Sequence, residues 1–163
     1  MKGTAFKFGV NISTDHIAPG RLFHLRSNLP EFAKHVLEDA DETFASRMKK
    51  GDFVVAGNNF GLGSSREHAP QIIKIAGVGA VLAKSFARIF YRNAINIGLL
   101  AIECDTDGID AGDELDLDIE KGCIHNLTKG TMIAIEPLPP VMIKLLNDGG
   151  LVEHIKKNGD FKL

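Results

Sequence analysis

The chain has 163 residues, of which 44% are hydrophobic and 25% are charged, a composition that suits one globular domain over residues 1–163 with a sizeable core. Its formal net charge of −2 excludes the basic footprint of a nucleic-acid-binding protein and the polybasic patch of a membrane-surface protein. No apolar run approaches the roughly 20 residues that span a bilayer, and residues 1–7 lack the apolar core of a signal peptide, so a soluble cytoplasmic protein is expected.

The first third of the chain predicts two strands and two helical segments. Thr4 to Phe8 alternates between apolar and polar residues, which favours an early strand. Pro30 suits the first turn of a helix over Glu31–Leu37, because the N–H groups of that turn lack intrahelical partners. The remaining predictions in this part are a short helical turn at Phe44–Met48 and an apolar strand at Phe53–Ala56.

The middle of the chain continues to alternate helix and strand. A helix is predicted over Gln71–Ala76, followed by a buried parallel strand at Ala80–Ala83. Ser85 is expected to cap the next helix, which covers Phe86–Asn96 and ends at Gly98. One more strand is predicted at Leu99–Ile102.

From Asp113 onward the hydrophobic pattern changes to period two, which predicts antiparallel strands. Two further strands are predicted at Cys123–Leu127 and Met132–Glu136, and two short helices at Val141–Asn147 and Leu151–Lys157. The whole pattern predicts an α/β fold with a layered sheet and helices.

The segment from Gly57 to Pro70 (GNNFGLGSSREHAP) is the most informative stretch of the chain. It lies between a predicted strand and a predicted helix. Glycines at such a position let the backbone approach a ligand closely and leave N–H groups free, which attracts anions. The hydroxyls of Ser64 and Ser65 and the guanidinium of Arg66 add donors suited to carboxylate or phosphate. The segment therefore predicts a binding site for a negatively charged ligand.

Two common phosphate-binding motifs do not fit this segment. A Walker A motif would require a lysine before the serine pair, and Arg66 stands where a dinucleotide fingerprint would have its third glycine. A glycine-rich turn, with Ser64 or Ser65 as the N-cap of the helix, is the structural alternative.

The full segment resembles the signature of the C-terminal, swivelling domain of aconitase-superfamily hydro-lyases. Two further matches follow the order of that family, Ser13–Arg21 (STDHIAPGR) and Ala83–Asn93 (AKSFARIFYRN). The likeness runs from about Phe6 to about Lys156 and points to the free-standing small subunits of the isopropylmalate dehydratase and homoaconitase branch. It implies a single swivelling β/β/α domain with layered sheet and helices.

The resemblance also implies a reaction and assigns residues to it. Dehydrating a hydroxy acid removes a weakly acidic proton beside a carboxylate while the hydroxyl leaves, which requires a base and carboxylate anchors. By resemblance, Ser64 is the base and works as an alkoxide, which the helix N-terminus after it would help to stabilise. Ser65 and Arg66 would hold a substrate carboxylate, Arg66 bidentately, and Asn59 and Gly63 would lie beside the substrate.

Asp15 and His16 belong to the first matched segment. The resemblance pairs the Asp15 position with a histidine of the catalytic partner domain, so Asp15 is a candidate catalytic residue. An Asx turn before Pro19 and Gly20 is the structural alternative. We interpret His16 as structural. The other histidines lack metal-ligand spacing and are interpreted as surface or core groups, with His68 set apart because it belongs to the signature.

Substrate specificity is expected in the loop Gly20–Asn28, because in the family this segment contacts the part of the substrate that differs between relatives. An apolar surface from Leu22, Phe23 and Leu25, with His24 between them, would suit a branched alkyl group. Arg26 falls near the position at which an arginine would meet a third carboxylate. Whether Arg26 faces the site or solvent stays open, and with it the choice of substrate.

Two cysteines, Cys104 and Cys123, are too far apart for a Cys-x-x-Cys motif, and both are interpreted as packing residues in a reducing compartment. Two thiolates are too few for an iron–sulfur cluster, which typically needs three or four. We therefore expect no cofactor and no metal on this chain. The resemblance implies a [4Fe-4S] cluster in a large catalytic partner subunit, within a heterodimer or heterotetramer.

The resemblance implies the small subunit of a hydro-lyase that isomerises a 2-hydroxy dicarboxylic acid by dehydration and rehydration, and that is not active alone. The expected substrate is 3-isopropylmalate, of leucine biosynthesis. Alternatives are the small subunit of a homoaconitase or of a 2,3-dimethylmalate-type dehydratase. A non-catalytic carboxylate-binding or regulatory domain is the alternative of another class, and the acidic balance argues against RNA as its ligand.

Overall fold

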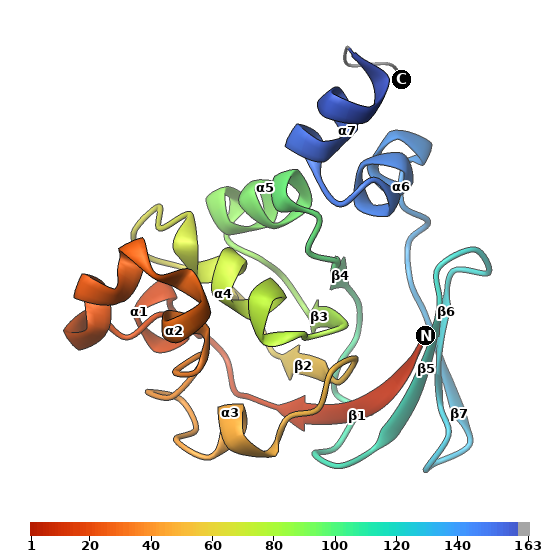
Figure 1. Cartoon of the computed structure of the whole chain (residues 1–163). Coiled ribbons are helices and arrows are strands. Elements are labelled where there is room, and N and C mark those ends of the chain that lie inside the picture. Colours follow the sequence, from red (N-terminus) through yellow and green to blue (C-terminus); the bar gives the residue numbers. More distant parts are fainter. Residues whose placement is uncertain (160–163) are drawn as a thin grey trace.

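The computed structural model describes residues 1–159, and the last four residues of the domain expected over residues 1–163 lie outside that range. Within it, a mixed sheet has the strand order β4-β3-β2-β1-β5-β6-β7 (Figure 1). The strands β1 to β4 are parallel to one another. On the other side of β1, the strands β5, β6 and β7 pair in antiparallel fashion. The strands are β1 (Lys2–Lys7), β2 (Phe53–Ala56), β3 (Ala80–Ala83), β4 (Ala101–Glu103), β5 (Glu114–Asp118), β6 (Cys123–Asn126) and β7 (Thr131–Ala134).

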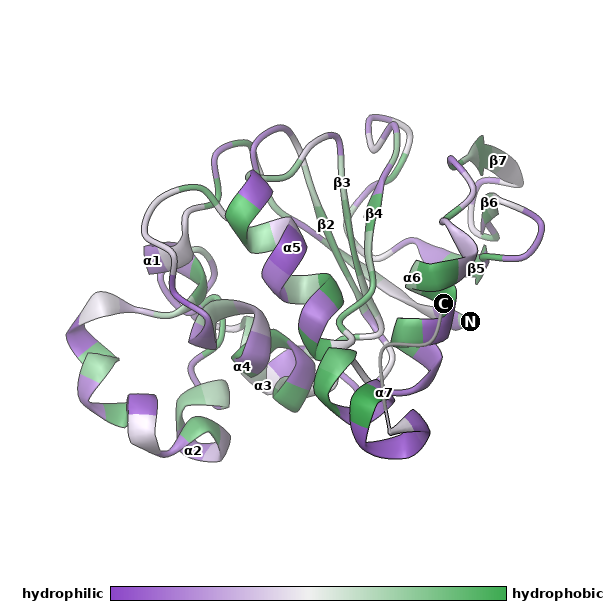
Figure 2. Ribbon diagram, turned by 90° about the horizontal axis from the view of Figure 1, so that it is seen from above, coloured by the Kyte–Doolittle hydropathy of each residue, from purple (hydrophilic) through white to green (hydrophobic). Residues whose placement is uncertain are grey.

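Helices cover one face of the parallel part of the sheet, and α4, α5 and α7 alternate between hydrophilic and hydrophobic segments, as amphipathic helices do (Figure 2). Gly77 and Gly98 end α4 and α5 in the left-handed conformation, with φ values of 95° and 76°. The helices are α1 (Thr14–Ile17), the 3₁₀ helix η1 (Gly20–Ser27), α2 (Leu29–Ala33), α3 (Phe44–Arg47), α4 (His68–Ala76), α5 (Arg88–Ile97), α6 (Pro140–Asn147) and α7 (Leu151–Asn158).

Each parallel strand contributes alternate side chains to two separate cores. Val54 and Ala56 of β2 pack with residues of α2, α4 and α5, whereas Phe53 and Val55 pack on the other face. That second face is covered by the antiparallel strands β5 and β6, because the sheet curls over it (Figure 1). The result is a layer of helices, a parallel layer and an antiparallel layer, and the α/β prediction with layered sheet and helices is confirmed.

Three local predictions need correction. The helix expected over Glu31–Leu37 ends at Ala33, and the chain turns back so that Leu37, at φ 58°, donates its N–H to the carbonyl of Ile17 at 2.9 Å. The N-cap of α5 is Ala87, because the hydroxyl of Ser85 accepts a hydrogen bond from the Asn59 N–H instead, at 2.8 Å. The segment Gly20–Ser27, expected as a loop, is a 3₁₀ helix with a kink at Leu22.

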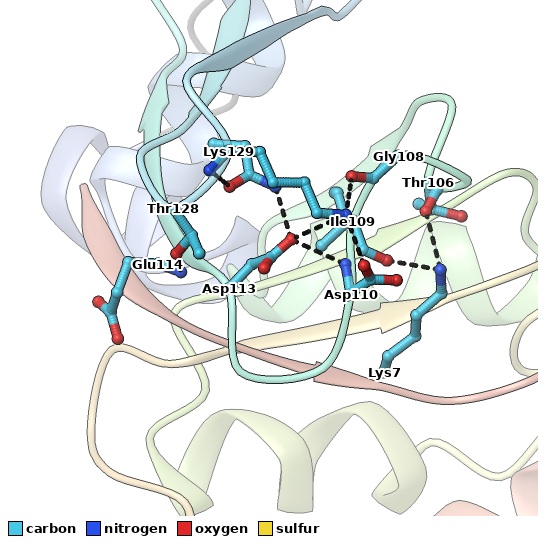
Figure 3. Close-up of polar contacts among 10 residues, drawn as sticks. Lys7, Thr106, Gly108, Ile109, Asp110, Asp113, Glu114, Thr128 and Lys129 are labelled. Atoms are coloured by element: carbon cyan, nitrogen blue, oxygen red, sulfur yellow. Dashed lines mark hydrogen bonds and ion pairs between the residues drawn. The ribbon is translucent and has the colours of Figure 1, made fainter.

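A polar network fixes the connection between β4 and β5 (Figure 3). Asp113 accepts hydrogen bonds from the Asp110 N–H at 2.8 Å and from Asn126 Nδ2 at 2.6 Å. Lys129 bridges the two aspartates, and Lys7 of β1 donates to carbonyls of the same connection. The network ties the start of the antiparallel layer to β1. In residues 1–159 we find no helix with the length and apolar character that a membrane crossing requires.

Candidate active site

The three matched segments meet where the parallel strands end. The stretch after β1 runs beside the loop after β2, with Gly61 N–H donating to Ile12 O at 2.7 Å and Thr14 N–H donating to Leu62 O at 2.8 Å. The loop also forms a parallel bridge between Phe60 and Phe86, before α5. Tertiary contacts therefore assemble Ser13–Arg21, Gly57–Pro70 and Ala83–Asn93 into one region of the molecule.

Glycines in the loop are required by space as well as by conformation. Gly61 has φ 81°, and a Cβ there would lie 2.2 Å from Cγ of the Phe90 ring. Gly63 has φ 107°, and its Cβ would lie 3.3 Å from Thr14 Oγ1. Such φ values favour glycine, because a side chain is strained in the left-handed region. The packing of α1 and α5 against the loop thus explains the glycine spacing.

Ser64 and Ser65 are exposed at the end of this loop. The backbone carbonyl of Ser64 accepts hydrogen bonds from Thr14 Oγ1 at 3.1 Å and from the Arg66 N–H at 2.7 Å, which holds the loop in place. The helix begins only at His68, with Glu67 as its N-cap, so neither serine is the N-cap and the helix N-terminus does not directly follow Ser64.

Arg66 is held by the segment that follows β1. Its Nη1 lies 2.5 Å from Asp15 Oδ1 and donates to the carbonyl of Ala18 at 3.2 Å. Gly20 passes close to this pair, since a Cβ at that position would lie 3.4 Å from Asp15 Oδ1. Asp15 and Arg66, predicted from two separate segments, are therefore brought into direct contact.

An open pocket of about 650 Å³ joins these groups. Apart from one glycine, its lining residues carry hydroxyl groups, charged groups or aromatic rings. The lining residues are Gly20, Phe23, Ser64, Ser65, Arg66, Glu67 and His68. Gly20, Glu67 and His68 were not assigned to the site from the sequence, although Glu67 and His68 stand inside the signature and Gly20 opens the specificity segment.

His68 lies between two phenylalanine rings at the floor of the site. Its ring stacks on Phe32 at 5.5 Å between centroids and meets Phe23 edge-on at 5.6 Å. Among the residues that the structure describes, its buried Nε2 has no hydrogen-bond partner. Burial, followed by the positive charges of Arg66 and Arg26, lowers the pKa of His68, which favours the neutral imidazole.

The specificity segment divides between the pocket and the core. Phe23 lines the pocket, whereas Leu22 and Leu25 are half-buried and pack against the helix-side core, and His24 is exposed. Arg26 stacks on Phe23, with its guanidinium carbon 4.4 Å from the ring centroid, and donates from Nη1 to the carbonyl of Phe23 at 3.2 Å. The stacking explains how an exposed arginine and an apolar ring share this segment.

Asn59 was predicted beside the substrate, and His16 was interpreted as structural. Asn59, at φ 62°, donates from Nδ2 to Asn11 Oδ1 at 3.2 Å and is exposed, but it is not among the residues that line the pocket. His16 forms a capping box with Ser13 at the start of α1, which confirms the structural interpretation of His16. The short helix α1 thereby holds Asp15 toward Arg66.

The thiols of this chain do not fit an iron–sulfur cluster. Cys123 is buried in β6, and burial raises the pKa of the half-buried Cys104 thiol to about 12, so Cys104 is not poised as a thiolate. Within residues 1–159, no group of three or more His, Cys, Asp or Glu side chains is arranged to hold a metal ion.

Comparisons with known proteins agree with this architecture. The Aconitase C-terminal domain family matches residues 25–107. A "3-isopropylmalate dehydratase small subunit 2" from Archaeoglobus fulgidus is 63% identical over 163 residues, covering 100% of this chain and 99% of the relative. A "3-isopropylmalate dehydratase small subunit 1" from Thermotoga maritima is 60% identical over 99% of this chain and 98% of the relative.

A solved structure extends the likeness to three dimensions. The crystal structure of a 3-isopropylmalate dehydratase (leuD) from Methanocaldococcus jannaschii superposes with a TM-score of 0.92 at 46% sequence identity, covering 97% of this chain and 94% of that chain. Identity at this level over nearly the full length of each protein reaches well beyond a shared fold. The chain belongs to the aconitase C-terminal domain family, among the small subunits of 3-isopropylmalate dehydratases.

Proposed function

We propose that this chain is the small subunit of a hydro-lyase that isomerises 3-isopropylmalate by dehydration and rehydration. The observation that carries the proposal is one pocket in which the exposed hydroxyls of Ser64 and Ser65 stand beside Arg66, on a loop shaped by glycines. The names of relatives at 60% and 63% identity support the same reaction. The apolar ring of Phe23 in this pocket suits a branched alkyl substituent.

The loop residues Ser64, Ser65 and Arg66 have chemical roles in this proposal. Ser64 takes the proton from the carbon beside the substrate carboxylate, and returns a proton to the intermediate when water is added back. A serine hydroxyl is a poor base unless its alkoxide is stabilised, and the guanidinium of Arg66 supplies positive charge in the same pocket. Arg66 and Ser65 hold a substrate carboxylate, because the planar guanidinium matches its two oxygens.

A large subunit completes the site in this proposal. The pocket is open, and the two cysteines of the chain do not suit a cluster, so the partner would contribute the remaining wall and a [4Fe-4S] cluster. Such a cluster, when bound, acts as a Lewis acid on the substrate hydroxyl. Asp15, whose side chain is 60% exposed, lies on the rim that the partner would cover.

Activity is expected only in the assembled enzyme. The purified chain should not convert 3-isopropylmalate, whereas the chain reconstituted anaerobically with its large subunit should, as followed by ultraviolet absorbance of the unsaturated intermediate. A preparation of the large subunit alone is the control. Turnover by the pure, metal-free chain would contradict the proposal. Tight carboxylate binding without turnover in the reconstituted complex would favour a non-catalytic binding domain instead.

Substrate choice is tested at Arg26. The guanidinium stacks on Phe23 and donates to the carbonyl of its own turn, so Arg26→Ala should change kcat/KM for isopropylmalate by no more than about threefold. The measurement compares isopropylmalate, a methylated malate and homocitrate in wild type and variant. A homocitrate preference that collapses in Arg26→Ala would instead identify Arg26 as the ligand of a third carboxylate.

A further inference from the structure

The group best suited to bind a substrate carboxylate is already engaged by a carboxylate of the same chain. Asp15 Oδ1 lies 2.5 Å from Arg66 Nη1, and the same nitrogen donates to Ala18 O at 3.2 Å. A guanidinium binds a carboxylate most strongly with two parallel N–H bonds. Nη1 already donates to the Ala18 carbonyl and forms an ion pair with Asp15, so a ligand carboxylate that approaches the end of the fork meets the Asp15 carboxylate there.

We propose that Asp15 is an internal stand-in for the substrate carboxylate, which masks Arg66 in the free small subunit and releases it when the large subunit docks. The inference rests on the proposed function and adds a coupling between assembly and substrate binding. To draw Asp15 away, the partner must present a cation or a hydrogen-bond donor at this rim. Substrate is then held firmly only where the complete active site can convert it.

The local geometry allows this exchange without refolding. The backbone around Asp15 is fixed, because Thr14 donates to the carbonyls of Leu62 and Ser64. The Asp15 side chain itself is 60% exposed, whereas that of Arg66 is 21% exposed. A change of the Asp15 side-chain rotamer is therefore enough to free Arg66, which stays in place under the Ala18 carbonyl and near the Phe23 ring.

The charge of Asp15 weakens the binding of substrate to the free small subunit. A dicarboxylate that approaches the free pocket meets the Asp15 carboxylate beside the guanidinium, so repulsion offsets much of the attraction. Ion pairs with one exposed partner are weak, so the mask is readily displaced once another group takes Asp15. The ion pair between Asp15 and Arg66 is therefore weak enough to be broken when the large subunit binds.

The test titrates the isolated full chain with D-malate, a dicarboxylate probe, and follows the backbone amide signals of Ser65 and Arg66 by NMR. Asp15→Asn should bind D-malate about five- to tenfold more tightly than wild type, because the competing charge is gone. Asp15→Ala should give the same direction, which guards against a new bond between asparagine and Arg66. The double variant Asp15→Asn/Arg66→Ala should lose the gain.

The matched control is Asp39→Asn, which breaks a comparable surface pair, Asp39 Oδ1 with Arg21 Nη1 at 2.6 Å, outside the pocket. It should leave the affinity for D-malate at the wild-type value. Equal affinity of Asp15→Asn and wild type, or no binding by either, would overturn the inference. Turnover of isopropylmalate by the assembled wild-type enzyme is measured separately. If the assembled enzyme turns over but Asp15→Asn binds D-malate no more tightly, only the inference about Asp15 is wrong. If Asp15→Asn binds more tightly but the assembled enzyme does not turn over, the proposed function is wrong.

Discussion

Replacing Ser64 by alanine should lower kcat of the assembled enzyme by about 10²–10⁴-fold, the range typical for loss of a general acid or base. KM should change much less, because the carboxylate anchors Ser65 and Arg66 remain. The loop itself should be preserved, since Ser64 is held through its backbone carbonyl by Thr14 Oγ1 and Arg66 N–H, and alanine keeps that carbonyl. Steady-state kinetics with isopropylmalate, at equal occupancy by the large subunit, measure the effect.

Ser65→Ala is the matched control, because it removes a neighbouring exposed hydroxyl from the same pocket. As a carboxylate ligand, Ser65 should affect KM more than kcat. Arg66→Lys keeps the charge but loses the fork, so it should also act mainly on substrate binding. A Ser64→Ala enzyme with near-normal kcat would show that the base is a different group.

Gly61→Ala should destabilise the chain by about 3–4 kcal/mol. Two causes add: the left-handed backbone at φ 81°, and a Cβ placed 2.2 Å from Phe90 Cγ. The Phe90 ring has little room to retreat, because it packs edge-on against Phe60 at 5.2 Å and stacks with Phe86 at 6.2 Å. Urea unfolding of the isolated chain, analysed with a common m value, gives the difference.

Gly130→Ala separates the two causes. Gly130 has a similar backbone, with φ 68°, but a Cβ there would find nothing within 4 Å. It should therefore lose only about 1 kcal/mol, the conformational part alone. If Gly61→Ala were no more destabilising than Gly130→Ala, the loop that contains Gly61 would have to pack less closely against Phe90 of α5 than the structure indicates.

Much of the fold could be predicted from local pattern. Four-residue apolar runs such as Phe53–Ala56 and Ala80–Ala83 became the buried parallel strands, and Gly98 ended α5 as expected, because these signals depend on neighbours in sequence. The cap at Ser85 was wrong because its hydroxyl bonds to Asn59, 26 positions away. The 3₁₀ helix η1 was not predicted, although its two half-buried residues, Leu22 and Leu25, stand three positions apart, the spacing of a 3₁₀ helix.

The candidate site divides in the same way. The serine pair and Arg66 could be predicted because they are adjacent in sequence and lie within one glycine-spaced segment. The contact of Asp15 with Arg66, and the bond from Thr14 to the Ser64 carbonyl, join residues about fifty positions apart and exist only through the pairing of two loops. No periodicity within either segment predicts them. The position of His68 between Phe23 and Phe32, and the lowered pKa that its burial causes, likewise depend on the tertiary fold.

The place of β1 in the sheet has a consequence for biosynthesis. Ala5 pairs with Phe53 on one side, while Gly3 pairs with Leu115 on the other, so β1 is completed by a strand that the ribosome makes much later. Until β5 emerges, β1 keeps one open edge and the second core lacks its cover. Such long-range pairing slows folding and leaves an aggregation-prone edge during synthesis. Nascent chains that stop before residue 114 should therefore depend on chaperones in a way that the finished subunit does not.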